Sequence, residues 1–152
     1  MTIRAATPAD TPELLRMARS FLEATPYGRL FKATPDSLEA LVGLLFSFGD
    51  QATILVAEDA GFVYGMLAIV ASPHPFNGKQ YADEVVWWVD PTARGAGLAG
   101  PKLLRCAEDW ARARNCYMVK MVAPFGSTVG GFYERLGYTP IETAYAKTLG
   151  GE

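Results

Sequence analysis

The sequence is poor in the residues that most often bind metal ions. Cys106, Cys116 and His74 are its whole supply of cysteine and histidine among 152 residues, and no C-x-x-C pair occurs. A zinc site draws most of its ligands from cysteine and histidine at close spacing. The sequence therefore predicts no metal site and two reduced thiols.

Long apolar runs and an excess of positive charge are also missing. No apolar run approaches the length of about 20 residues that crosses a bilayer, and the opening MTIRAATPAD lacks the apolar core of a signal peptide. The net charge of -2 offers no basic surface for a phosphate backbone. We therefore expect a cytoplasmic protein that binds neither membrane nor nucleic acid.

What is present fits a globular domain. Half of the residues are apolar and 20% are charged, and we find no internal repeat, linker or low-complexity segment. A chain of this length can bury a sizeable core. We expect residues 1–152 to form a single domain.

The spacing of apolar residues changes along the chain between a helical and a strand period. Helices are predicted at 8–24, 34–49, 101–114 and 129–136, a loop at 27–34, and strands at 2–7, 52–59, 61–72, 81–89, 116–123 and, as one or two strands, 138–149.

The stretch VDPTARGAGLAG at 89–100 places Gly95, Gly97 and Gly100 as G-x-G-x-x-G. A dinucleotide fingerprint belongs to the first strand of a doubly wound sheet, with an acidic residue about 20 positions later, and neither condition is met. The lysine of a P-loop is absent as well. Exposed amides at a helix start still form a cradle for an anion such as a pyrophosphate, and an ordinary tight turn is the alternative.

Two motifs in the second half of the chain extend this hypothesis. VDPTARGAGLA, an amphipathic helix, a strand and FYERLGY at 132–138 follow one another, and together they resemble the GNAT superfamily of acyl-CoA-dependent N-acyltransferases. The resemblance covers nearly the whole chain. It implies an α+β, three-layer fold, with a mixed, mostly antiparallel central sheet of about six to seven strands and about four flanking helices.

The resemblance also implies acetyl-CoA as cosubstrate. In the family the glycine loop binds the pyrophosphate and the preceding strand holds the pantetheine arm. The corresponding residues are Arg94, Gly95, Ala96, Gly97, Leu98 and Ala99 in the loop and Trp87, Trp88 and Val89 in the strand. Many members carry an asparagine where this chain has Gly126-Ser127, and Ser127 is a candidate substitute.

Catalytic candidates follow from the same resemblance. Tyr133 is the counterpart of the tyrosine that protonates the departing thiolate, and its alternative role is to pack as an ordinary helix tyrosine. The base is expected on the strand before the loop, where Asp83 and Glu84 are adjacent. Because successive strand residues face opposite ways, only one of the two addresses the cleft, although a bulge of the kind that the family carries there could switch which. Glu84 is preferred.

The resemblance therefore implies an enzyme that transfers acetyl to a primary amine by direct attack. The acceptor, a small amine or a protein amine, is expected between segments 25–34 and 72–81. A non-catalytic acyl-CoA-binding module with the same fold is the alternative function. The sequence leaves the choice between monomer and homodimer open.

Overall fold

A computed structural model describes residues 1–93 and 95–150 of the chain. It contains a sheet of five strands in the order β1-β2-β3-β4-β5. The strands are β1 (Thr2–Ala5), β2 (Ala52–Asp59), β3 (Phe62–Pro73), β4 (Gln80–Val89) and β5 (Val119–Lys120). The first four are antiparallel neighbours, and β5 runs parallel to β4.

The described residues also form five α-helices. They are α1 (Thr11–Ala24), α2 (Tyr27–Leu30), α3 (Pro35–Ser47), α4 (Ala96–Ala113) and α5 (Val129–Arg135), with short 3-10 turns η1 (Pro8–Asp10) and η2 (Gly49–Gln51). Helix α3 begins where its sequence predicts, because the Thr34 hydroxyl accepts the Ser37 amide at 3.1 Å. No helix in the described ranges is both long and apolar enough to cross a membrane.

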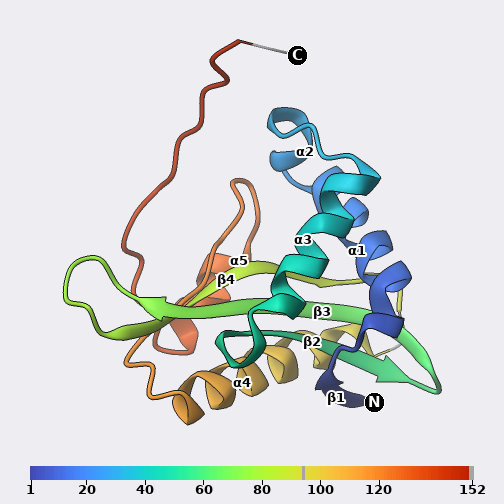
Figure 1. The fold of residues 1–152 in the computed structure, drawn as a ribbon, viewed down its shortest axis with the longest axis horizontal. Coiled ribbons are helices and arrows are strands. Elements are labelled where there is room, and N and C mark those ends of the chain that lie inside the picture. Colours follow the sequence, from blue (N-terminus) through green and yellow to red (C-terminus); the bar gives the residue numbers. More distant parts are fainter. Residues whose placement is uncertain (94, 151–152) are drawn as a thin grey trace.

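The helices cover both faces of the sheet and so create two cores. Helices α1 and α3 lie on one face and α4 on the other (Figure 1). On the α1 face, Leu14 and Met17 pack against Val56 and Met66. On the α4 face, Leu103 and Tyr133, the latter from α5, pack with the sheet residues of the second core. The chain thus has the predicted α+β architecture with a mostly antiparallel sheet.

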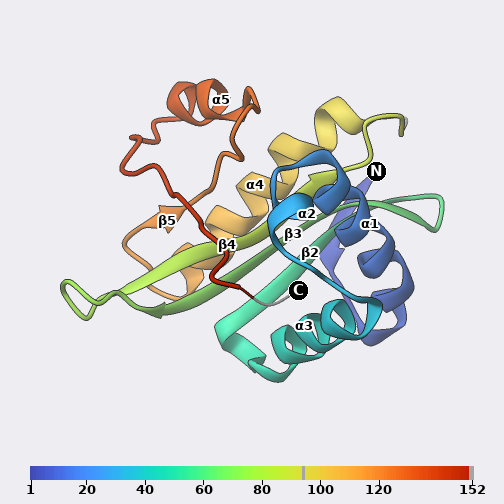
Figure 2. The same cartoon turned by 90° about the horizontal axis from the view of Figure 1, so that it is seen from above.

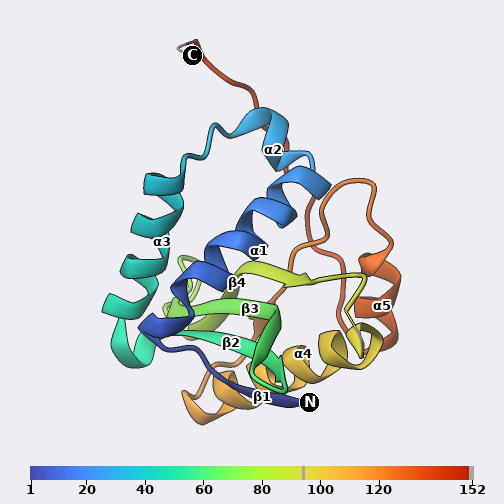
Figure 3. The same cartoon turned by 90° about the vertical axis from the view of Figure 1, so that its right-hand side faces the viewer.

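The prediction of six to seven strands was wrong. Residues 138–149 form no strand and extend away from the sheet (Figures 1 and 3), with Tyr145 93% and Leu149 88% exposed. An extended backbone becomes a strand only where a neighbouring edge accepts its hydrogen bonds. The predicted strand 116–123 is likewise reduced to Val119–Lys120.

Two helix predictions also differ from the structure. The expected loop 27–34 contains the single-turn helix α2, and α4 starts at Ala96 rather than at Pro101. Pro101 lies in the second turn of α4, where it has no N–H to donate to the carbonyl of Gly97 four residues earlier, so the prediction that the helix begins at Pro101 was wrong. The early start places the glycine loop directly at the helix N-terminus.

Two irregularities in β4 shape the surface beside it. The β3–β4 register shifts between Ala68 and Ile69, which leaves Val85 as an extra residue of β4. As a result, Glu84 and Trp87 lie on the same side of the sheet, although they are three positions apart. Pairing of β4 with β5 stops after Asp83 and Lys120, and the chain then turns away toward α5 (Figure 2).

Candidate active site

A cleft of about 440 Å³ opens where β4 and β5 separate. Its walls come from the end of α1, from β4, from the segment after β5, and from α5. The lining residues are Phe21, Ala24, Thr25, Glu84, Trp87, Trp88, Val89, Val122, Pro124, Phe125, Gly126, Ser127, Val129 and Tyr133. Because α1 and α5 lie on opposite faces of the sheet, the cleft passes between the strands from one face to the other.

Glu84 is one of the residues that line this cleft. Its carboxylate accepts the backbone N–H of Val122 at 2.7 Å, so the side chain bridges the two strands where their backbone pairing has ended. Burial raises the pKa of the Glu84 carboxyl to about 7; the Val122 hydrogen bond opposes the shift, and the neighbouring Asp83 charge adds to it. Near neutral pH this carboxyl exchanges a proton readily.

Tyr133 approaches the same point from α5. Its side chain is buried, and its hydroxyl donates to the Val122 carbonyl at 2.9 Å. Burial raises the pKa of the Tyr133 phenol, and the Glu84 carboxylate raises it further. The phenol is therefore protonated at neutral pH and can act as a proton donor.

Val122 joins these two side chains, and sequence reasoning missed it. Its N–H binds Glu84 and its carbonyl binds Tyr133. A carboxyl that can accept a proton and a phenol that can donate one are thus held on a single peptide residue. Nothing in the sequence marks this position, because the role belongs to the backbone and any residue except proline could supply it.

The two adjacent tryptophans face opposite sides of the sheet, yet both line the cleft. Trp87 packs beside Tyr133 with 5.8 Å between ring centroids, and its buried indole N–H has no hydrogen-bond partner among the described residues. On the α1 side, Trp88 donates its indole N–H to Asp90 at 2.9 Å, and Asp90 is paired with Arg16 at 2.7 Å. Each indole ring is therefore held in place.

Asp83 is placed differently from Glu84. It is absent from the cleft lining, and it accepts the Tyr81 hydroxyl at 3.3 Å on the opposite side of the strand. Ser127 lies in the turn that follows β5, where its N–H donates to the Pro124 carbonyl at 3.0 Å. This turn forms part of the cleft wall.

The glycine loop lies at the N-terminus of α4. Gly95 has a φ of 84°, a left-handed backbone that glycine adopts at little cost, and it begins the helix. Gly97 and Leu98 are exposed in the first turn, whereas Ala99 is fully buried in the core. The partial positive charge of an 18-residue helix is directed at this end. Arg94, the predicted entrance residue, lies outside the described residues.

Comparison with known proteins decides the family. Residues 14–138 of the chain match the acetyltransferase (GNAT) family. The chain belongs to this family. The GNAT fold therefore accounts for the separated β4 and β5 strands, and membership makes the protein an acyltransferase of a family that uses acetyl-CoA.

Solved structures described as acetyltransferases resemble this chain over nearly their whole length. A putative acetyltransferase from Agrobacterium tumefaciens has a TM-score of 0.76 at 24% identity, covering 98% of this chain and 100% of its own. Glucosamine-6-phosphate N-acetyltransferase from Arabidopsis thaliana gives 0.71 at 21% identity, with 98% of each chain covered. An aminoglycoside antibiotic 6'-N-acetyltransferase from Acinetobacter haemolyticus gives 0.75 at 18%, with complete coverage of both chains. No curated relative matches the sequence.

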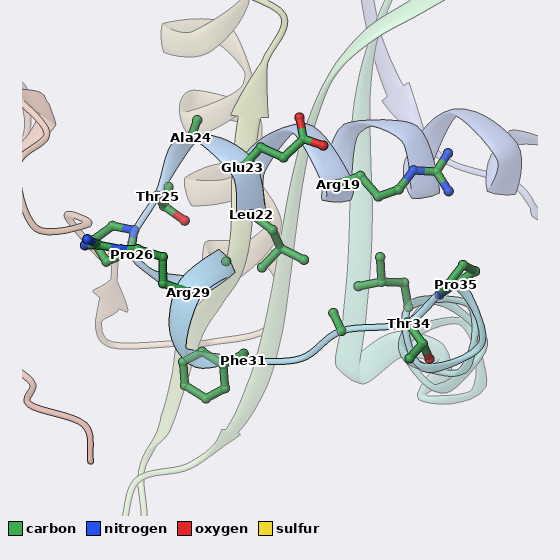
Figure 4. A pocket seen from close by; sticks show the side chains of 13 residues that line it. Arg19, Leu22, Glu23, Ala24, Thr25, Pro26, Arg29, Phe31, Thr34 and Pro35 are labelled. Carbon is green, nitrogen blue, oxygen red and sulfur yellow. The ribbon is translucent and has the colours of Figure 1, made fainter. Parts of the chain in front are cut away.

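This GNAT protein has a second cavity, of about 680 Å³, between α1, α2 and the start of α3. Helices α1 and α3 separate toward α2, which connects them (Figure 3). In Figure 4, Leu22 points toward the stretch from Phe31 to Thr34, and Glu23 points away from it. Ala24 and Thr25 line both this cavity and the cleft, so the end of α1 is the wall between them.

Proposed function

We propose that this GNAT protein transfers an acetyl group from acetyl-CoA to a primary amine by direct attack within a ternary complex. The observation that supports the proposal is the pair of hydrogen bonds to Val122, which hold Glu84 and Tyr133 together in the cleft. Their raised pKa values suit an acceptor and a donor of protons.

The cleft also fits the proposed cosubstrate. Within residues 1–93 and 95–150, the part of β4 after Asp83 has no strand partner on the β5 side, so the backbone edge from Trp87 to Val89 can pair with an amide-containing chain. In the same part of the chain the buried indole N–H of Trp87 lacks a partner, which favours a bound acceptor atom. The N-terminus of α4, with Arg94 through Ala99, is the proposed site for the pyrophosphate.

In the proposed mechanism, acetyl-CoA supplies the acetyl group as an activated thioester. Glu84 first removes a proton from the acceptor ammonium, directly or through water, which frees the nitrogen lone pair for the carbonyl carbon. A C–N bond forms and the C–S bond breaks. Tyr133 then leaves the Val122 carbonyl and gives its proton to the departing thiolate. The second proton of the nitrogen, which becomes acidic once the C–N bond has formed, passes directly or through water to the tyrosinate and restores the phenol, and Glu84 returns its proton to the solvent. The products are an N-acetyl amine and CoA.

Replacing Tyr133 by phenylalanine tests this proposal. The ring remains to pack the core while the proton donor is lost, so we expect kcat to fall by roughly 100-fold to 10,000-fold with little change in acetyl-CoA affinity. Thiol release measures turnover, and isothermal titration measures affinity. Tyr145→Phe is the matched control, because Tyr145 is 93% exposed and distant from the cleft lining.

The same titration separates the alternatives. Binding of acetyl-CoA, together with no turnover of any amine, would favour a non-catalytic acyl-CoA-binding module. Binding weakened by Arg94→Ala would support the pyrophosphate site at the glycine loop. If acetyl-CoA does not bind to the folded protein at all, the transferase proposal fails.

A further inference from the structure

The two ends of the cleft differ in what they can bind. The α5 end is continuous with the turn at Ser127, and the proposed pyrophosphate site at α4 lies on that face of the sheet. On the α1 face the lining consists of Phe21, Ala24, Thr25 and Trp88. If the cosubstrate enters at the α4 and α5 face, as the proposed function requires, the acceptor enters at the α1 face.

The lining carries very little charge. Among the described residues that line it, Glu84 is the single carboxylic acid, and there is no lysine, arginine or histidine. Arg19, Glu23 and Arg29 line the second cavity, beyond the wall formed by the end of α1 (Figure 4). Asp90, which accepts the indole N–H of Trp88, is already paired with Arg16. A ligand in the cleft therefore meets one negative charge and otherwise apolar or neutral surface.

This charge pattern excludes acceptors with further charged groups. Glu84 can balance the one ammonium that reacts. A second ammonium would enter the cleft without a carboxylate, and a phosphate would enter without a cation, and each uncompensated charge is costly to desolvate. An acceptor that carries nothing charged except its amine avoids both costs.

The α1 face also offers fixed aromatic surfaces. Trp88 is held by Asp90, as described above, and Phe21 stacks with Tyr27 at a centroid distance of 5.8 Å. Fixed rings bind an aromatic group with little loss of side-chain entropy. Beside them the buried Thr25 hydroxyl has no partner among the described residues, so it is available for one hydrogen bond to the ligand.

We infer that the acceptor is a primary amine attached to an uncharged, aromatic or similarly apolar group, which lies between Phe21 and Trp88 and presents its nitrogen to Glu84. This inference rests on the proposed function for the direction in which the acceptor enters. The aromatic surface of Phe21 and Trp88 lines the cleft whether or not the proposed function is correct.

Amine binding tests the inference separately from turnover. The protein saturated with CoA is titrated with phenethylamine, tryptamine, spermidine and glucosamine 6-phosphate at one ionic strength. We expect the two aromatic amines to bind at least about tenfold more tightly than the other two. Equal or tighter binding of spermidine or glucosamine 6-phosphate, or no binding of either aromatic amine, would overturn the inference.

A charge introduced at the aromatic wall gives a second test. Phe21→Asp should weaken phenethylamine binding by about tenfold and strengthen spermidine binding, because it supplies a second carboxylate. Leu44→Asp is the control, because Leu44 is 51% exposed on α3 and lies outside both cavities. Preferences that are unchanged in Phe21→Asp, in a variant with native circular dichroism, would contradict the assigned site.

The outcomes distinguish the inference from the proposed function. If aromatic amines bind without being acetylated, the inferred amine site is supported and the proposed transferase activity is contradicted. If spermidine is acetylated in preference to aromatic amines, the transferase activity is supported and the inferred preference for aromatic amines is contradicted. If CoA does not bind, the same amines are titrated into the free protein, where the aromatic preference is still expected.

Discussion

At the scale of single residues, the chemistry of the site depends on one peptide unit. Val122 contributes no functional side chain, yet its N–H and carbonyl hold Glu84 and Tyr133 at 2.7 Å and 2.9 Å. Burial then raises both pKa values. A carboxyl that titrates near neutral pH has consequences for stability as well as for activity.

Glu84 should make the protein less stable as pH rises. Its pKa is about 7 in the folded protein and 4.5 in an unfolded chain, so between these values the folded state binds more protons. The free energy of unfolding therefore receives its full contribution below pH 4.5 and loses it as pH rises to about 7. We expect this loss to be roughly 1–3 kcal/mol.

Urea unfolding of Glu84→Gln between pH 4.5 and 8 measures this effect. The glutamine can still accept the Val122 N–H, so the variant should lose only the Glu84 contribution to the pH dependence of the unfolding free energy. At pH 8 it should be more stable than the parent, because it buries no charge at this position. Glu39→Gln, an exposed change on α3, is the control and should keep the parental slope. Identical slopes for the parent and Glu84→Gln would contradict the assigned burial.

The same group predicts how the proposed activity depends on pH. A base must be deprotonated, so kcat/KM should fall about tenfold per pH unit below a pKa of about 7. Initial rates across pH 5–9 measure this fall in kcat/KM toward low pH. Glu84→Gln should lower the rate at every pH and abolish the fall. If kcat/KM of the variant still falls in the same way below pH 7, another group is the base.

At the scale of elements, the end of α1 matters because it separates the cleft from the second cavity. The chain reverses there through Thr25 and Pro26 into α2, and Gly28 lies against the end of α1. A Cβ at Gly28 would lie 2.3 Å from the Leu22 carbonyl oxygen. Backbone atoms cannot yield to such a contact, so the turn tolerates only glycine at this position.

We predict that Gly28→Ala displaces the turn and with it one wall of the cleft. The expected result is a loss of roughly 1–3 kcal/mol in unfolding free energy and weaker amine binding. Gly43→Ala is the matched control on α3, where a Cβ would have no neighbour within 4 Å, and there alanine should stabilise the helix. Thermal unfolding and amine titration compare the two variants, and equal effects would refute the prediction.

At the scale of the whole molecule, the cleft connects the two halves of the fold. One wall comes from α1 on one face of the sheet and another from α5 on the other face. A ligand that fills the cleft contacts both halves, so its binding energy adds to the stability of the entire folded state.

Acetyl-CoA should therefore raise the melting temperature. At 100 times its Kd the expected stabilisation is about 2.7 kcal/mol, or roughly 5–10 °C for a chain of this size. Differential scanning fluorimetry measures the shift, with NAD and ATP as controls that we expect to have no effect. An equal shift with NAD or ATP would show that the glycine loop does not select the acyl-CoA.

The sequence by itself determined what depends on local spacing. The apolar period of 3.6 predicted α1 and α3, whose apolar face is buried. Runs with a period of two or of continuous β-branched residues predicted β2 and β3, which are buried over most of their length. The motif around Tyr133 and the glycine loop at 95–99 indicated the family, since those residue types suit anion binding and proton transfer. That identification is confirmed by the family match.

The tertiary structure decided what depends on neighbours distant in the sequence. The extra residue at Val85, which sets the side of Glu84, arises from pairing with β3 and has no sequence signal. Val122 acquires its role only because β4 and β5 separate beside it. Residues 138–149, predicted as one or two strands, find no edge to pair with, because backbone pairing is a property of two segments rather than one.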